Sequence, residues 1–207
     1  MLLIIIGIIF SYLLGSIPTA YIFGKVLKGV DIRQFGSGNV GATNALRLLG
    51  KGPGITVLIL DIIKGFIPVF LFGNLILARI NFIDNETLCL ILGISCVCGH
   101  NWTVFLQFKG GKGIATTLGV LIGLSTVSPS LRLILGLLIL TWITVFLIGR
   151  IVSLASVIGA AALPVYAIIL RQTLVLIFFS VLLSAFVIYR HKANLKRILS
   201  GQEKRLF

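Results

Sequence analysis

The decapeptide FGSGNVGATN, residues 35–44, has the composition of a loop that binds an anion. Its glycines allow backbone N–H groups to converge on a bound group, and a helix beginning near Val40 would point its positive end into the same space. Arg47, one turn beyond Thr43, offers a bidentate fork for a phosphate. An interfacial turn with a helix cap would use similar residues, so this stretch alone leaves both interpretations open. The side chains that add hydrogen-bond donors are Ser37, Asn39, Thr43 and Asn44.

Two nucleotide-binding motifs are excluded by their context. Gly36, Gly38 and Gly41 satisfy G-x-G-x-x-G, and Asp61 follows twenty residues later, but no strand precedes the glycines and Asp61 lies in an apolar run. A P-loop is excluded because no lysine here has the glycine and Ser/Thr neighbours that the motif requires.

A second glycine-rich basic stretch, KGGKG at residues 109–113, precedes another apolar run. Lysines that anchor a helix on the cytoplasmic side would explain its charge but not its three glycines. Two such loops indicate either one polyanionic ligand or two phosphate-bearing ligands. The candidate phosphate-binding residues of this stretch are Gly110, Gly111, Lys112 and Gly113.

Further candidates lie near the C-terminus and inside the apolar runs. His191 and Asn194 are three residues apart, on one face if the last apolar helix continues. His191 could be a base, a phosphate donor or an interfacial residue. Asp61 and Lys64 are also three apart and can neutralise each other, so a structural and a functional role both stay open.

The segment CVCGHNW, residues 96–102, does not predict a metal site. Cys96 and His100 share a helical face, but no fourth ligand is near. We expect His100 and Asn101 to form hydrogen bonds between helices instead. The basic tail that follows Asn194 is expected to be a surface helix attracted to anionic lipid.

The elements that must position these residues are membrane-spanning helices. Of 207 residues, 58% are hydrophobic and 11% charged, and the mean hydropathy is +1.15. Runs of about 20 apolar residues are needed to cross roughly 30 Å of hydrocarbon. We therefore predict an all-α polytopic membrane protein, with residues 1–207 forming a single domain. The seven predicted transmembrane helices cover about residues 2–24, 54–78, 87–107, 114–128, 131–148, 153–170 and 173–190.

The distribution of charge predicts the orientation of these helices. Fourteen of the 18 Lys and Arg residues fall on the side of the C-terminus, whereas Arg79, Arg132 and Arg171 fall on the other side. The positive-inside rule then places the N-terminus outside and the C-terminus in the cytoplasm. Both glycine-rich stretches, the junction at Arg150 and Ser153, and the tail all face the cytoplasm in this arrangement, which suggests one site.

Five segments taken together identify a family resemblance. They are GSGNVGATNALR, LDIIKG, GHNWTVFLQFKGGKGIAT, RIVSLAS and HKANLKRILSGQEK, and they follow one another along nearly the whole chain. The sequence resembles the bacterial acyl-phosphate:glycerol-3-phosphate acyltransferases. The resemblance implies an integral enzyme of the bacterial cytoplasmic membrane, with its active site facing the cytoplasm. Such an enzyme transfers a fatty acyl group from acyl phosphate to the 1-hydroxyl of glycerol 3-phosphate, giving lysophosphatidic acid for phospholipid synthesis.

The resemblance also implies roles for individual residues. The catalytic set is Ser37, Thr43, His191 and Asn194, and the supporting residues are Gly201 and Glu203. The phosphate-binding set is Gly36, Gly38, Asn39, Arg47, Gly110, Gly111, Lys112, Gly113 and Ser153, of which Gly110 to Gly113 belong to the motif associated with glycerol phosphate.

We expect direct transfer without an acyl-serine, because neither histidine has an Asp five residues away and no G-x-S-x-G elbow occurs. The base would be His191 or a substrate phosphate oxygen. We expect the protein to be a monomer that uses no cofactor and no metal and binds no nucleic acid. Its expected partners are membrane lipid, acyl phosphate and glycerol 3-phosphate. The alternative function is a transporter of a phosphorylated solute, but such a protein should show an internal repeat, which we do not find.

Overall fold

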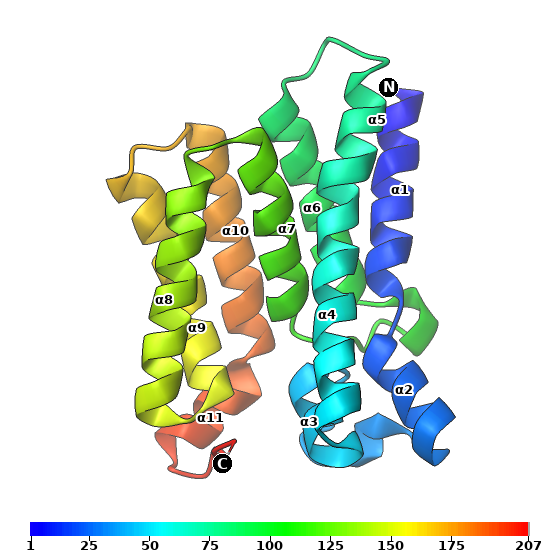
Figure 1. The fold of residues 1–207 in the computed structure, drawn as a ribbon, viewed down its shortest axis with the longest axis vertical. Helices are drawn as coiled ribbons and strands as arrows, with labels where there is room; N and C mark the ends of the chain where they lie inside the picture. The colour runs from blue at the N-terminus through cyan, green and yellow to red at the C-terminus, as the bar shows by residue number, and fades with distance from the viewer. Residues whose placement is uncertain (207) are drawn as a thin grey trace. The chain divides into compact units, whose positions relative to one another are not determined.

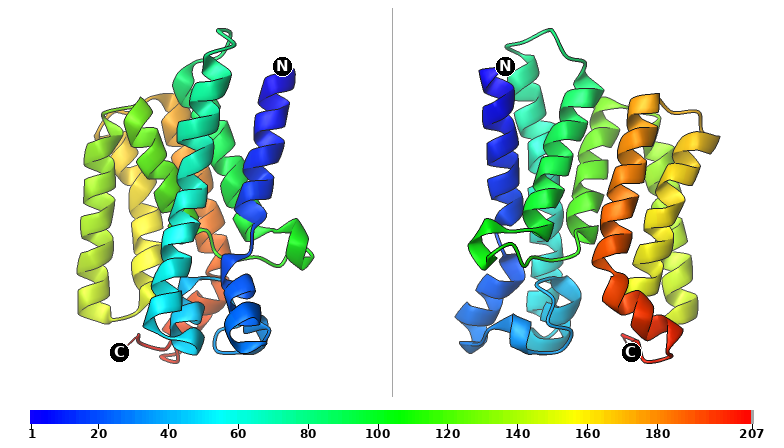
Figure 2. Two further views of the ribbon diagram at one scale, coloured as in Figure 1. Left: turned by 45° about the vertical axis from the view of Figure 1, so that its right-hand side comes forward. Right: turned by 180° about the vertical axis from the view of Figure 1, so that it is seen from behind.

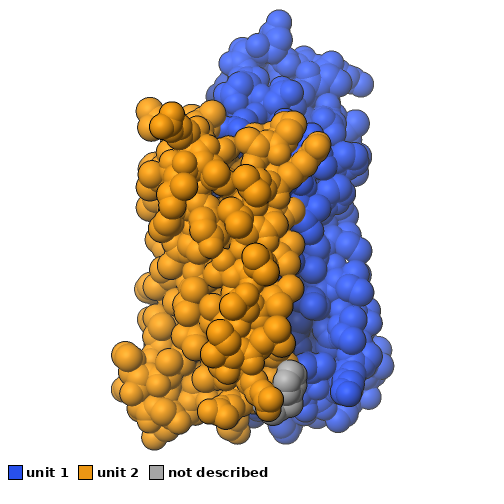
Figure 3. Space-filling view, turned by 60° about the vertical axis from the view of Figure 1, so that its left-hand side comes forward, with its two compact units in different colours: residues 1–127 blue, residues 128–207 orange. Residues whose placement is uncertain are grey.

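The computed structural model describes residues 1–206, which consist of helices and connecting turns without any β-strand. The predicted all-α fold is therefore confirmed. The chain divides into two compact units, shown in different colours in Figure 3: unit 1 is Met1–Val127, and unit 2 begins at Ser128. That the whole chain acts as one domain stays a prediction.

The helices are labelled in Figure 1. Unit 1 contains α1 (Leu2–Ser16), α2 (Thr19–Lys28), a 3₁₀ turn η1 (Ile32–Gln34), α3 (Ala42–Leu49), α4 (Lys51–Ile67), a π-helical segment η2 (Pro68–Phe72), α5 (Gly73–Leu77), α6 (Asn85–Asn101), a 3₁₀ turn η3 (Val104–Leu106) and α7 (Ile114–Val127). Unit 2 contains α8 (Leu131–Gly149), α9 (Val152–Ile169), α10 (Leu174–Arg190) and α11 (Lys192–Leu199).

Helices lie at all seven places where apolar runs predicted them, but not all are long enough to span a membrane alone. In residues 1–206, five segments are long and apolar enough to cross a membrane. Helix α10 reaches that length only together with α11, and the two are bent by 61° relative to each other. The 14 residues of α7 rise only about 21 Å, less than the roughly 30 Å of a hydrocarbon core. Seven spans and their orientation stay predictions. The five segments are Leu2–Lys28, Lys51–Leu77, Asn85–Leu106, Leu131–Gly149 and Val152–Ile169.

The span predicted over residues 2–24 is present as Leu2–Lys28, but it consists of two helices with a break between them. The helix ends at Ser16 and a new one begins at Thr19, because Pro18 has no N–H to donate and restricts the residue before it. The freed carbonyls find side-chain partners. Thr103 Oγ1 donates to the Ser16 carbonyl at 2.5 Å, and Lys64 Nζ donates to the Ile17 carbonyl at 2.9 Å. Figure 2 shows the segment between α6 and α7 passing beside this break.

Helices of unit 1 approach closely wherever glycine faces a neighbouring backbone. A Cβ on Gly15 of α1 would lie 2.0 Å from the Cys96 carbonyl oxygen of α6, and a Cβ on Gly65 of α4 would lie 2.1 Å from the Thr116 carbonyl oxygen of α7. Small residues at such contacts are typical of helix packing in lipid, where apolar burial gives little driving force. These contacts fix α6 and α7, and hence the loop that joins them.

In unit 2, polar side chains link the helices while apolar ones face outwards. Thr141 and Tyr166 share a hydrogen bond of 2.7 Å between α8 and α9. Leu140, Leu147 and Ile148 of α8 are instead 61%, 67% and 82% exposed. Outward apolar faces of this kind suit helices surrounded by lipid tails.

We predict that Gly65→Ala lowers the melting temperature of the detergent-purified protein by roughly 5 °C, since overpacking costs about 1–3 kcal/mol. Its methyl group meets backbone, which cannot rotate away. The control is Gly52→Ala in the same helix, because a Cβ there meets nothing within 4 Å. Equal melting temperatures for the two variants would contradict the close approach of α4 and α7.

Candidate functional site

The first glycine loop, residues 35–44, is organised by the side chain of Asn44. Asn44 lies in α3 and is 1% exposed. Its Oδ1 accepts from the Ser37 backbone N–H at 3.0 Å, and its Nδ2 donates to the carbonyls of Ile32 and Phe35, both at 3.1 Å. The expectation that Asn44 donates to an anion is therefore wrong, because both its amide N–H groups hold the loop.

The glycines give this loop its shape more than they give it donors. Gly36 has φ 59°, and a Cβ there would lie 2.3 Å from Asn44 Oδ1, while Gly38 has φ 68°. The N–H of Gly38 donates to the Phe35 carbonyl at 2.9 Å, so it serves the turn itself. At the start of α3, the N–H groups of Asn44 and Ala45 both donate to the Gly41 carbonyl at 3.1 Å, which leaves those of Ala42 and Thr43 as the N-terminal donors of the helix.

The predicted side chains of this loop are accessible. Thr43 and Arg47 are four residues apart on α3 and so share one face. Ser37 and Arg47 are exposed, and Asn39 and Thr43 are half-buried. The structure thus brings these four together on one short loop and helix, with hydroxyl, amide and guanidinium donors.

The second glycine loop, residues 109–113, is attached to the end of α6. The Gly110 N–H donates to the Asn101 carbonyl at 3.2 Å, and the Gly111 N–H donates to the His100 carbonyl at 2.9 Å. These two N–H groups attach the loop to the end of α6. That Gly110 and Gly111 take part in phosphate binding stays a prediction. Lys112 stays partly exposed, and α7 begins directly after Gly113.

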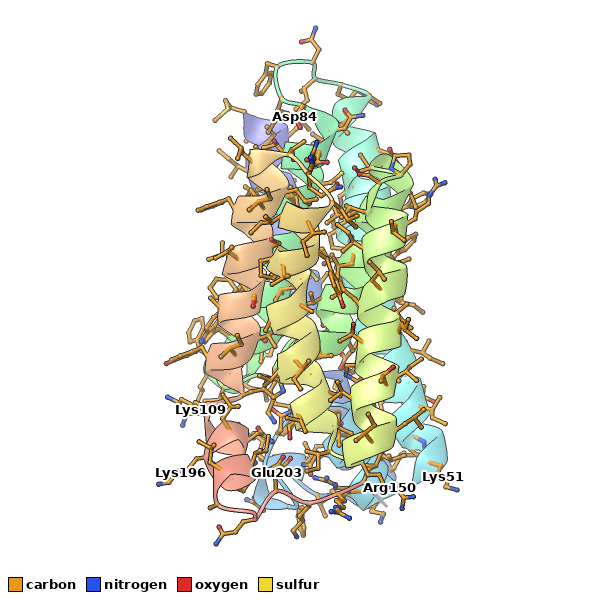
Figure 4. All side chains as sticks on the ribbon, turned by 90° about the vertical axis from the view of Figure 1, so that its left-hand side faces the viewer. Lys51, Asp84, Lys109, Arg150, Lys196 and Glu203 are labelled. Atoms are coloured by element: carbon orange, nitrogen blue, oxygen red, sulfur yellow. The ribbon has the colours of Figure 1, made fainter. Side chains whose placement is uncertain are left out.

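One apolar cluster supports both loops. Leu106, just before the second loop, is buried with Ile32 and Val40 of the first. In Figure 4, Lys51 and Lys109 lie towards one end of unit 1 and Asp84 lies towards the other. The two loops therefore share one end of unit 1, as a common site requires. The full cluster is Ala20, Ile32, Val40, Ala45, Val57 and Leu106.

Asp61 and Lys64 form the predicted ion pair, with Lys64 Nζ 2.8 Å from Asp61 Oδ1. Both are buried, and Asp61 Oδ1 also accepts from Thr19 Oγ1. The expectation of hydrogen bonds for Asn101 is wrong, since its side-chain atoms are buried without a hydrogen-bond partner among residues 1–206.

In unit 2, the carboxylate of Glu203 gathers three side chains. Its Oε1 accepts from Ser153 Oγ at 2.7 Å and from Asn194 Nδ2 at 2.5 Å. Its Oε2 accepts from Arg197 Nε at 2.6 Å. Gly201, at φ 69°, follows α11 where the chain turns back towards these groups. In Figure 4, Arg150, Lys196 and Glu203 lie at the same end of unit 2.

These contacts set the charge of Glu203. Burial would raise the pKa of this carboxyl, but hydrogen bonds from Ser153, Asn194 and Arg197 outweigh burial and hold the pKa below its ordinary value of 4.5. The carboxylate is thus ionised at neutral pH. The sequence indicated that these residues belong together, but it did not show that Glu203 orients the other two.

His191 lies at the junction of α10 and α11 and is 2% exposed. Its Nδ1 lies 2.8 Å from the Val187 carbonyl oxygen. A carbonyl can only accept, so this contact places the ring proton on Nδ1 and makes Nε2 an acceptor in the neutral ring.

Comparison with known proteins decides the family. The family described as Glycerol-3-phosphate acyltransferase matches residues 5–201. Proteins named glycerol-3-phosphate acyltransferase from Thermoanaerobacter sp. (strain X514) and Aquifex aeolicus (strain VF5) are each 43% identical to this chain, over 96% of it and over 93% and 96% of their own lengths. The chain belongs to the glycerol-3-phosphate acyltransferase family.

A crystal structure of the family also matches. PlsY, an integral membrane glycerol 3-phosphate acyltransferase, in its glycerol 3-phosphate form, has 39% sequence identity and a TM-score of 0.86, covering 98% of this chain and 94% of PlsY. A second structure, the lysophosphatidic acid form, gives a TM-score of 0.82 at 38% identity over the same shares. The predicted family and the assignment as an acyltransferase enzyme in a bacterial membrane are therefore confirmed.

We predict that Asn44→Asp disrupts the first glycine loop of this acyltransferase. A carboxylate oxygen would replace the N–H groups that face two carbonyls, and buried polar groups left without partners cost about 1–3 kcal/mol each. Acyl transfer should fall at least about tenfold, measured as the initial rate. The matched control is Asn74→Asp, whose Nδ2 also donates to a carbonyl, that of Phe70, but at an exposed position. Equal losses in the two variants would refute the organising role of Asn44.

We predict that Glu203→Gln lowers the melting temperature at pH 7 by roughly 3–6 °C, because hydrogen bonds to a charged group contribute about 1.5–3 kcal/mol. The native pKa of Glu203 lies below 4.5, so its contribution to stability is complete above that pH and is lost as the pH falls through the native pKa. The difference between wild type and variant should therefore be constant from pH 8 to about 5 and should narrow below 4.5. A difference that does not change with pH would contradict the ionised state.

Proposed function

We propose that this protein transfers a fatty acyl group from an acyl phosphate to the 1-hydroxyl of glycerol 3-phosphate, giving lysophosphatidic acid and inorganic phosphate. The observation that carries the proposal is the 39% identity, over 98% of the chain, to PlsY in a form named for glycerol 3-phosphate. The second PlsY form, named for lysophosphatidic acid, supports the identity of the product.

Unit 1 contributes the groups that hold phosphate. Arg47 and Asn39 form one phosphate-binding group at α3 and the loop before it, and Ser37 and Thr43 beside them orient substrate oxygens. Lys112, at the start of α7, forms a second cationic group. Their position at one end of unit 1, over a shared apolar cluster, supports two phosphate-bearing substrates held close together.

Unit 2 contributes Asn194, which orients substrate oxygens, and Ser153, which takes part in phosphate binding. Glu203 fixes Asn194 and Ser153, so their polar atoms are held in place before substrate arrives. Preorganised polar groups of this kind stabilise charge that develops during reaction. Gly201 and Glu203 are then supporting residues, in agreement with the roles implied by the family motif.

The reaction is direct transfer. The glycerol hydroxyl oxygen bonds to the acyl carbonyl carbon, the bond from that carbon to the phosphate oxygen breaks, and phosphate leaves with the electron pair. The hydroxyl proton passes to His191 Nε2 or to a phosphate oxygen. The protein works mainly by alignment, because an acyl phosphate is already activated.

The active end faces the cytoplasm in this proposal. The predicted seven spans, with the N-terminus outside, place both glycine loops and the C-terminal tail on the side rich in Lys and Arg. In Figure 4, the labelled basic residues Lys51 and Lys109 lie towards one end of unit 1, and Arg150 and Lys196 lie at one end of unit 2, which agrees with this placement. The protein acts as a monomer without a cofactor.

The test uses purified protein in lipid with radiolabelled glycerol 3-phosphate and either palmitoyl phosphate or palmitoyl coenzyme A. We predict lysophosphatidic acid from the acyl phosphate alone. Lys112→Ala should lower kcat/KM about 10- to 100-fold, the cost of one charge-assisted contact. The control is Lys109→Ala in the same loop, which should keep wild-type activity because its side chain is exposed outside the glycine core. No product from either donor would refute the proposed function.

A further inference from the structure

A buried polar cluster lies directly behind the second glycine loop, and the proposed chemistry does not use it. Asp61 is 1% exposed, Lys64 is 5% exposed and His100 is 7% exposed. They come from α4 and α6, whereas the loop joins α6 to α7. Ionisable groups inside a membrane protein are costly unless they are paired, so this cluster calls for a functional or structural reason.

The ion pair in this cluster is internally satisfied. Asp61 Oδ1 accepts from Lys64 Nζ at 2.8 Å and from Thr19 Oγ1 at 2.5 Å. Lys64 Nζ also donates to the Ile17 carbonyl at the break between α1 and α2. The pair therefore ties α4 to the chain on both sides of the break and forms a rigid base.

His100 connects that base to the loop. Its Nδ1 lies 3.9 Å from Asp61 Oδ1, so the ring lies beside the buried carboxylate without a direct hydrogen bond to it. The other ring nitrogen lies against Gly111, so close that a Cβ on Gly111 would sit 2.1 Å from His100 Nε2. The ring thus fills the space between the buried carboxylate and the loop backbone.

The contact explains why position 111 has no side chain. The φ of Gly111 is outside the left-handed region, so its backbone conformation is open to other residues. The three atoms nearest to such a methyl group all belong to the ring of His100. Lys112 is the next residue, and a shift of the Gly111 backbone moves its ammonium group directly.

We propose that His100 is a positioning residue for Lys112: the imidazole ring, which lies beside the buried Asp61–Lys64 pair, supports Gly111 and fixes the second glycine loop in its phosphate-binding form. This inference rests on the proposed function, in which Lys112 binds a substrate phosphate. His100 does not contact substrate and acts through the loop backbone.

The decisive experiment is a rescue test. Gly111→Ala forces the methyl group against the ring and should raise KM for glycerol 3-phosphate at least tenfold, with kcat within about threefold of wild type. Adding His100→Ala removes the obstructing ring. The double variant should therefore recover to the KM of His100→Ala alone, which is expected to be threefold to tenfold above wild type.

Gly110→Ala is the matched control for this test. A Cβ on Gly110 would lie 2.1 Å from the His100 carbonyl oxygen, so it meets backbone and not the ring. Adding His100→Ala should give no recovery there. Recovery in both pairs would overturn the proposal, because His100→Ala would then be loosening the whole loop. Recovery in neither pair would also overturn it, because the glycine substitutions would then damage the loop without involving the ring.

A second measurement separates positioning from simple stability. His100→Gln keeps a polar group near the ring position, and His100→Phe keeps the volume without nitrogen. We expect His100→Gln to retain a KM within about threefold of wild type and His100→Phe to raise it about tenfold, at equal melting temperatures. Combined with Lys112→Ala, His100→Phe should add no further loss, because the group that it positions is gone. Independent losses that multiply would contradict the proposal.

The outcomes also separate this inference from the proposed function. If the wild type makes no lysophosphatidic acid from palmitoyl phosphate, the proposed function fails. If the wild type is active but the rescue pattern is absent, only the positioning role of His100 fails.

Discussion

Backbone carbonyls in an apolar environment must find partners inside the chain, and unit 1 is built around one place where a helix fails to supply them. The first helix breaks at Pro18, which leaves the carbonyls of Ser16 and Ile17 without α-helical partners, although the Ile17 carbonyl also accepts from the Thr19 N–H at 3.1 Å. A hydroxyl and an ammonium group satisfy them, and the ammonium group in turn requires a buried carboxylate. From this one constraint follow the Asp61–Lys64 pair, the approach of Thr103, and the position of the segment that ends in the second glycine loop.

Both glycine loops are fixed by hydrogen bonds from their own backbone, but the acceptors differ. Each is held by hydrogen bonds from its own backbone N–H groups, one to the amide of Asn44 and the other to the carbonyls that end α6. Glycine is needed because a held loop lies against buried groups, where a side chain would collide. In the proposed function, rigid loops of this kind hold the Arg47 guanidinium and the Lys112 ammonium group in place for phosphate, which lowers the entropy lost on binding.

Unit 2 reaches a comparable result through one carboxylate. Glu203 accepts hydrogen bonds from Ser153 of α9 and from Asn194 and Arg197 of α11. The lowered pKa of Glu203 keeps its carboxylate ionised at neutral pH, so these three hydrogen bonds to a charged acceptor persist there. The positions of Ser153 and Asn194 are thus set by a residue that follows them in the chain.

The sequence by itself determined the helical class, the places of the apolar helices and the family, because the length of apolar runs and the order of motifs can be read along the chain. It also predicted the Asp61–Lys64 pair, since three residues along a helix bring two side chains together. Only the tertiary structure decided that Asn44 holds a loop and does not face a ligand, that Gly110 and Gly111 donate to α6, and that His100 lies behind Gly111. Those roles depend on which buried polar groups meet across distant segments, and spacing along the chain does not encode that pairing.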